Sequence, residues 1–161
     1  MPVFDVAIAD LQGKPLELDQ FRDSAVLVVN VASRCGLTPQ YAQLEALQKA
    51  YADRGFTVVG FPSNQFLQEL SSDEAVAEYC STTWGVTFPM SEKVRVNGRS
   101  AHPLYQELTG TPDLDGKQGR ITWNFEKFLV SPTGEVKRFA PQTTPDAPEV
   151  VEAIEAWLPE R

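Results

Sequence analysis

Histidine and cysteine are scarce in this chain of 161 residues, which contains one histidine, His102, and two cysteines, Cys35 and Cys80. Zinc and iron–sulfur sites are built from clusters of these residue types, so the sequence predicts no metal site and no other cofactor. Two cysteines without a paired spacing, in a chain without a secretory signal, are expected to be reduced at rest.

Basic residues are also in the minority, with 14 Lys and Arg against 22 Asp and Glu, for a net charge of −8. This charge disfavours binding to nucleic-acid phosphates and to anionic membrane surfaces. No apolar run approaches the roughly 18 residues of a membrane-spanning helix, and the N-terminus lacks a basic segment followed by an apolar core. We therefore expect a cytoplasmic protein with neither a nucleic-acid nor a membrane partner.

The hydrophobic fraction of 42% and the charged fraction of 22% are typical of a folded globular chain. A chain of this length can form one domain, here residues 1–161, that buries roughly 70% of the surface exposed when unfolded.

The segment around Cys35 predicts a strand followed by a helix. Residues 26–33 begin as an unbroken apolar run, which indicates a strand buried on both faces. Thr38-Pro39 has the form of a helix start, and a second apolar strand is expected over residues 56–61. Cys35 would then lie just before a helix N-terminus, where free N–H groups favour a thiolate.

The remaining pattern predicts an N-terminal β-hairpin over residues 3–21 and a helix over 71–84 that begins with a Ser71-x-x-Glu74 capping box. A short strand over 93–97, a helix over 104–108, strands over 121–130 and 135–139, and a last helix over 148–158 follow. This order predicts an α/β fold with a mixed central sheet flanked by helices. With a reactive cysteine after the first central strand, it is a thioredoxin-like fold.

Six motifs carry a resemblance that spans almost the whole chain. They are NVASRCG at 30–36, FPSNQF at 61–66, WGVTFPM at 84–90, VNG at 96–98, HPLY at 102–105 and WNFEKFLV at 123–130. In this order they resemble the glutathione peroxidase family, in its cysteine-containing, thioredoxin-dependent form.

The resemblance implies that Cys35 is the peroxidatic cysteine, which attacks a hydroperoxide and becomes a sulfenic acid. It also implies that the side chains of Gln68, Trp123 and Asn124 donate hydrogen bonds at the reacting oxygen. The loop departs from the family pattern, because Leu70-Ser71 stands where Pro-Gly is usual and one residue is missing. Gln65 therefore remains an alternative to Gln68 as the amide donor.

Cys80 has two interpretations. Its helical spacing with Val76, Tyr79 and Trp84 is typical of a packed core residue. The resemblance instead implies a resolving cysteine that forms a disulfide with Cys35, later reopened by thioredoxin. A disulfide needs Cα atoms within about 7 Å, so in that case the 71–84 helix must unwind on oxidation.

Three alternatives to this function stay open. Glutathione is a second possible reductant and would need a basic rim near Cys35, with candidates Arg34, Lys93, Arg95, Arg99 and Arg120. A peroxide sensor or relay would pass its disulfide to a partner protein. A Cys–His hydrolase would use His102, although a histidine before a proline at a helix start is more often structural.

The short 109–120 connection resembles that of the monomeric family members, so the resemblance implies a monomer.

Overall fold

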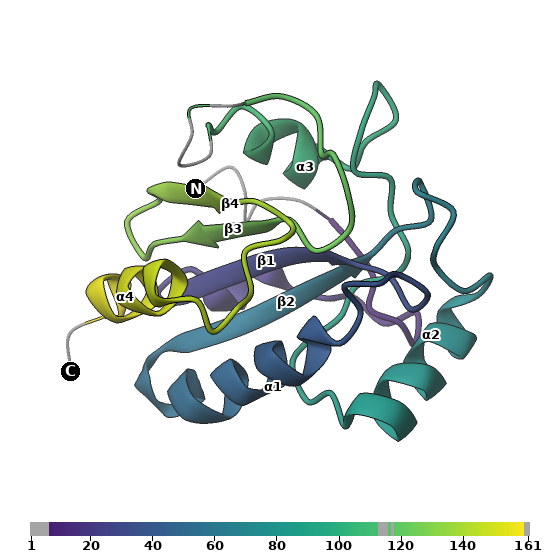
Figure 1. Cartoon of the computed structure of the whole chain (residues 1–161), viewed down its shortest axis with the longest axis horizontal. Coiled ribbons are helices and arrows are strands. Elements are labelled where there is room, and N and C mark those ends of the chain that lie inside the picture. Colours follow the sequence, from purple (N-terminus) through teal and green to yellow (C-terminus); the bar gives the residue numbers. More distant parts are fainter. Residues whose placement is uncertain (1–6, 113–115, 117, 160–161) are drawn as a thin grey trace.

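The computed structural model describes residues 7–112, 116 and 118–159. The described part of the chain forms a mixed sheet with the strand order β2-β1-β3-β4 (Figure 1). The strands are β1 (Ala25–Val31), β2 (Phe56–Pro62), β3 (Lys127–Val130) and β4 (Val136–Phe139). Since β1 is parallel to β2 and antiparallel to β3, the strand that precedes Cys35 lies inside the sheet.

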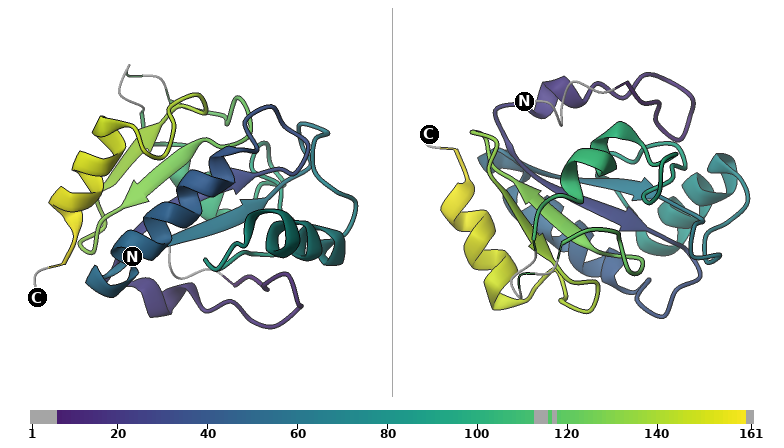
Figure 2. Two further views of the ribbon diagram at one scale, coloured as in Figure 1. Left: turned by 60° about the horizontal axis from the view of Figure 1, so that its bottom comes forward. Right: turned by 90° about the horizontal axis from the view of Figure 1, so that it is seen from above.

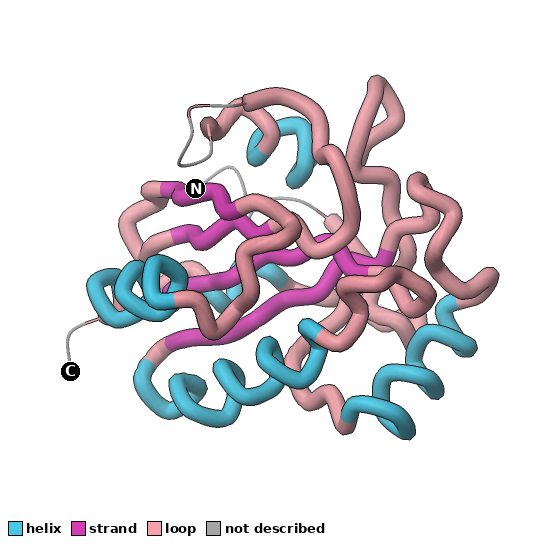
Figure 3. Tube along the Cα trace, in the orientation of Figure 1, coloured by secondary structure: helices cyan, strands magenta, loops and turns pink. Residues whose placement is uncertain are grey.

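The predicted strand–helix–strand unit is confirmed. Helix α1 (Gln40–Tyr51) follows β1 and lies along β2, as the tube trace in Figure 3 shows. A short 3₁₀ turn and Gly55, with a φ of 84°, then return the chain to β2. Every residue of β1 and β2 is buried. The unbroken apolar run therefore reflects a sheet that is covered on both faces.

Two layers cover the sheet, as the views in Figure 2 show. Leu27 and Val29 of β1 belong to a core cluster with side chains of α1 and of α4 (Pro148–Trp157). Val26 and Val28 point the other way and belong to a cluster with side chains of α3 (Pro103–Leu108). Successive strand residues face opposite sides, so one strand supplies both cores.

The strand predicted over 121–130 is wrong in its first half. β3 pairs with β1 only over Lys127–Val130, and β3 and β4 form the expected antiparallel hairpin. Phe125 has a φ of 68°, which lies outside the extended range and interrupts the strand. Residues 121–126 therefore form an irregular turn that carries Trp123 and Asn124.

The helix predicted over 71–84 is present in two parts. α2 spans Asp73–Tyr79, and a π-helical turn, η4, spans Cys80–Trp84. The N-cap is Ser72 rather than Ser71, because the Ser72 hydroxyl accepts the Ala75 N–H at 3.1 Å. A π-helical turn within a helix is rare and often marks a functional position.

The strand predicted over 93–97 is not formed. Met90 and Ser91 make isolated bridges to Gly60 and Asp10, and the chain beyond them is irregular. The Gln65 side chain accepts the Asn97 N–H at 2.8 Å, so an amide takes the place of a neighbouring strand.

The predicted N-terminal hairpin is reduced to one bridge, between Ala9 and Pro15, around Gly13 with its φ of 83°. The part of that prediction at residues 3–6 lies outside the described residues.

Candidate active site

Cys35 lies in a tight turn between β1 and α1. The Thr38 hydroxyl accepts the Cys35 N–H at 3.0 Å and donates to the Ala32 carbonyl at 2.8 Å. Thr38 thus closes this turn instead of capping α1, which begins two residues later at Gln40. The turn lets the Leu37 N–H donate to the Cys35 sulfur at 3.3 Å.

The Trp123 indole contacts the same sulfur from a segment 88 positions further along the chain. Its Nε1–H donates to Cys35 Sγ at 3.2 Å, while the ring packs on Phe66 with centroids 5.3 Å apart. Two N–H groups that point at one sulfur stabilise negative charge on it. Cys35 is nevertheless 7% exposed, so the site combines a nearly buried thiol with a polar environment.

Gln68 and Asn124 form an amide pair. Asn124 is fully buried and donates through Nδ2 to Gln68 Oε1 at 3.2 Å. The backbone carbonyl of Gln68 accepts the backbone N–H of Arg34 at 2.8 Å, which connects this loop to the turn that carries Cys35. With its oxygen facing Asn124, the Gln68 amide has its NH₂ group available to donate to a substrate oxygen.

Gln65, the alternative donor, lies in a different network. Its Oε1 accepts the backbone N–H groups of Val96 and Asn97, and its Nε2 donates to the Asn97 carbonyl at 3.2 Å. These bonds occupy both ends of the amide, so the geometry favours Gln68 over Gln65.

Glu69 connects the loop that carries Gln68 to the segment just before Cys35. Its Oε1 accepts the N–H of Ser33 at 3.0 Å and that of Leu70 at 2.8 Å, while its Oε2 is buried without a partner among the described residues. Burial raises the pKa of this carboxyl, and the hydrogen bonds from Ser33 and Leu70 oppose the rise. The sequence alone does not indicate this role, because Glu69 is one of several polar residues in a loop.

Cys80 lies in the apolar core on the π-helical turn and is 2% exposed. Both cysteines are free thiols. Burial raises the pKa of the Cys80 thiol to about 11, and the neighbouring Tyr41 hydroxyl offsets only part of this rise. In this conformation Cys80 stays protonated at neutral pH and is a poor nucleophile.

His102 caps α3 and has a structural role. Its Nδ1 accepts the Leu104 N–H at 3.2 Å, and its Nε2 lies 3.0 Å from the Ala7 carbonyl. Both ring nitrogens are therefore engaged away from Cys35, which removes the geometric basis for a Cys–His hydrolase.

Within residues 7–112, 116 and 118–159, no three His, Cys, Asp or Glu side chains gather in a way that could hold a metal ion. In the same part of the chain, no helix has both the length and the apolar character needed to cross a membrane.

Comparison with known proteins identifies the family. The glutathione peroxidase family model matches residues 3–109. The chain belongs to the glutathione peroxidase family. It is 49% identical over 177 residues to the thioredoxin/glutathione peroxidase BtuE of Escherichia coli strain K12, with 97% of each chain covered.

Solved structures agree with this family and with the predicted fold. The crystal structure of Trgpx in its apo form matches with a TM-score of 0.73 and 40% identity, covering 99% of each chain. A thioredoxin-family thiol:disulfide interchange protein from Chlorobium tepidum matches with a TM-score of 0.63 over 96% of this chain and 97% of that one, at 22% identity. The predicted thioredoxin-like fold is therefore confirmed, and the protein is a thiol peroxidase by family.

Proposed function

We propose that Cys35 is the peroxidatic cysteine of this peroxidase and that Gln68, Trp123 and Asn124 are its hydrogen-bond donors. The observation that carries the proposal is the hydrogen bond from the Trp123 indole to Cys35 Sγ, beside the Gln68–Asn124 amide pair. These groups come from three segments that are distant in the sequence. If Cys35 were only a packed core residue, its sulfur would not need hydrogen-bond donors.

The first step is attack of the Cys35 thiolate on the terminal oxygen of the hydroperoxide. The O–O bond breaks, an S–O bond forms, and the other oxygen leaves as water or an alcohol after it gains a proton. Sulfur loses two electrons and the peroxide gains them, which yields a sulfenic acid. N–H donors fixed near the sulfur stabilise the charge that develops on the leaving oxygen.

The second step is condensation of the sulfenic acid with Cys80. An S–S bond forms, and the sulfenic oxygen leaves as water with the thiol proton. Cys80 is buried in the reduced fold, where burial raises the pKa of its thiol, so the helix over 71–84, formed by α2 and η4, has to unwind before this step. The turn is suited to unwinding, because the Ser81 and Thr82 hydroxyls both donate to the Glu78 carbonyl and compete with its helical bonding.

Thioredoxin is the reductant that we propose for the resulting disulfide, since an internal disulfide is a substrate for a dithiol. A specific observation keeps glutathione as a second candidate. Arg34 lines a hollow of ≈ 500 Å³, and Lys93 and Arg95 line a second of ≈ 310 Å³, with Asn64 common to both. These cations lie beside the loop that carries Gln68, where they could pair with the carboxylates of glutathione.

Mass mapping after one equivalent of hydrogen peroxide tests the chemistry of both cysteines. The wild type should contain a Cys35–Cys80 disulfide, and Cys80→Ser should hold a sulfenic acid at Cys35. Absence of any oxidation at Cys35 would refute the peroxidatic assignment, and normal turnover of Cys80→Ser with thioredoxin would refute the resolving assignment.

Steady-state assays separate the remaining alternatives. Continuous peroxide consumption with thioredoxin, thioredoxin reductase and NADPH supports the proposal, whereas a sensor or relay stops after about one equivalent. Turnover with glutathione and its reductase in place of thioredoxin would favour the second candidate. The monomeric state and the cytoplasmic location stay predictions, which size-exclusion chromatography and cell fractionation can check.

A further inference from the structure

The turn that carries Trp123 and Asn124 has a strained backbone. Phe125, the next residue, has a φ of 68° although it has a bulky side chain and is fully buried. A left-handed backbone is unfavourable for a residue of this kind, so the surroundings have to hold it. Some group must therefore keep the turn in the shape that directs the indole to Cys35.

Asn30 is the group that makes these contacts. It is the single polar residue in β1 and is fully buried. Its Nδ2 donates to the Trp123 carbonyl at 3.1 Å, its Oδ1 accepts the Glu126 N–H at 3.0 Å, and its carbonyl accepts the Phe125 N–H at 2.6 Å. One residue thus fixes the backbone on both sides of the strained position.

The same strand leads directly into the turn that carries Cys35. The thiol and its indole donor are therefore held in register by one rigid element, although they are 88 positions apart in the sequence. We propose that Asn30 is a positioning residue for peroxide reduction, which holds the Trp123 indole at the Cys35 sulfur and the neighbouring Asn124 amide at Gln68. This inference rests on the proposed function of Cys35 and assigns Asn30 no contact with substrate.

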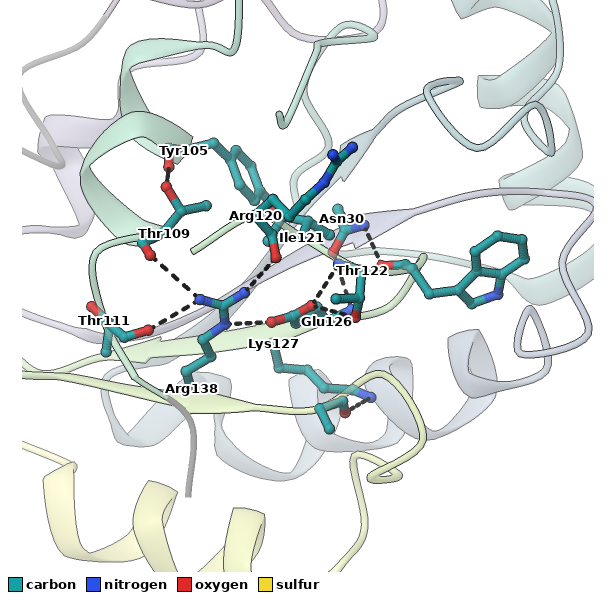
Figure 4. Close-up of polar contacts among 12 residues, drawn as sticks. Asn30, Tyr105, Thr109, Thr111, Arg120, Ile121, Thr122, Glu126, Lys127 and Arg138 are labelled. Atoms are coloured by element: carbon teal, nitrogen blue, oxygen red, sulfur yellow. Dashed lines mark hydrogen bonds and ion pairs between the residues drawn. The ribbon is translucent and has the colours of Figure 1, made fainter. Parts of the chain in front are cut away.

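A second set of contacts holds the outer side of the turn, as Figure 4 shows. The buried Glu126 carboxylate pairs with the Arg138 guanidinium, which also donates to the carbonyls of Thr111 at 3.1 Å and Arg120 at 3.2 Å. Glu126 also accepts the Thr122 N–H at 3.3 Å. These bonds do not involve Asn30, so a change at Asn30 should displace the turn without unfolding it.

Two variants remove the Asn30 contact to Trp123. Asn30→Asp keeps the side-chain shape and the acceptor for the Glu126 N–H but loses the donor to the Trp123 carbonyl. Asn30→Ser loses both side-chain bonds without adding a charge. Because a buried carboxylate can prevent folding, the serine variant keeps the inference testable if the aspartate variant does not fold.

The readout compares two reactions of Cys35 in each purified protein, in a Cys80→Ser background so that only Cys35 reacts. Reaction with hydrogen peroxide needs donors at the leaving oxygen, whereas alkylation by iodoacetamide expels iodide, which needs no proton. Both second-order rate constants are measured at a pH where alkylation has reached its plateau. The ratio of the two then reports how well the donors are positioned, and a general loss of stability does not change it.

We expect each Asn30 variant to lower the peroxide-to-alkylation ratio about 10- to 100-fold, as for a displaced donor. Asn97→Asp is the matched control, because this buried amide also brackets one backbone residue, Ile121, with bonds of 2.7 Å and 2.6 Å. The Asn97 side chain holds the start of the 121–126 turn and not the residues around Phe125 that Asn30 holds, so its variant should lose stability and keep the ratio within about threefold.

The outcomes separate this inference from the proposed function. A wild-type Cys35 that does not react with peroxide would overturn the proposed function itself. A reactive wild type with an unchanged ratio in a folded Asn30 variant would overturn the positioning role alone. An equal fall in the Asn97→Asp control would also overturn it, because the effect would then come from general loosening of the segment.

Discussion

Replacement of Trp123 by phenylalanine tests the site most directly. The change removes the indole N–H that donates to Cys35 Sγ at 3.2 Å and keeps an aromatic ring against Phe66. A hydrogen bond to a charged group contributes about 1.5–3 kcal/mol. If the same N–H stabilises the charge on the leaving oxygen, its loss should slow oxidation of Cys35 by roughly 10- to 100-fold.

The assay is stopped-flow oxidation of Cys35 by hydrogen peroxide in a Cys80→Ser background, across a pH range that reaches the plateau of the rate. The plateau decides the matter, because there all of Cys35 is thiolate and only the chemical step differs between the proteins. If the indole stabilises the resting thiolate alone, Trp123→Phe will leave the plateau unchanged or raise it, and the donor role is then refuted.

Trp157→Phe is the matched control for this measurement. Trp157 lies on α4, where the Lys137 ammonium nitrogen is 4.8 Å from the centroid of its ring. It is not part of the proposed site. Its replacement should leave the plateau rate within about twofold. A comparable loss in both variants would show that any missing indole slows the reaction.

Three further predictions concern stability and the second step. Burial lowers the pKa of Lys127 to about 7, so between pH 7 and 9 the folded state loses this proton while the unfolded state keeps it. The free energy of unfolding of the wild type should therefore rise over this range, by up to roughly 2 kcal/mol relative to Lys127→Met. Equal pH slopes of the two proteins in chemical denaturation would contradict this. Leu67 is 85% exposed and has a φ of 60°, a backbone conformation that glycine adopts without strain. Leu67→Gly should therefore raise the free energy of unfolding by about 0.5 kcal/mol in a denaturant titration. As the control, Ala42→Gly in α1 should lower it by about 1 kcal/mol. Ser72→Ala removes the N-cap of α2, which should make the helix easier to unwind and so speed formation of the Cys35–Cys80 disulfide a fewfold. Quenched-flow thiol trapping measures this rate. If the control Ser71→Ala is equally fast, the effect does not come from the cap.

Much of the fold was predictable because local patterns and tertiary environment agree. The apolar run predicts a buried strand over 26–33, and a buried strand forms over Ala25–Val31, since helices cover both faces of the sheet there. Helix α4 likewise follows its apolar spacing. Where a side chain from another segment replaces a local partner, the prediction was wrong, as for the expected strand at 93–97, which the Gln65 amide holds instead.

The resemblance predicts the members of the candidate site but not the contacts that hold them in place. The resemblance implies roles for Cys35, Gln68 and Trp123, but neither the strained φ at Phe125 nor the contacts of Asn30 can be read from the motifs. In the sequence, Asn30 is a polar residue inside an otherwise apolar run. Such a residue in a buried strand has to find partners, and here the partners belong to a segment 93 positions away.

The sequence by itself determined the strand that precedes Cys35, the helices around the sheet and the family, because periodicity and motifs are local properties of the chain. Only the tertiary structure decided that the Asn124 and Gln68 amides pair, where the strand at 121–130 is interrupted, and that Cys80 is buried, which raises the pKa of its thiol. These features depend on hydrogen bonds and burial between segments far apart in the sequence. Their energies arise only once the sheet has brought those segments together.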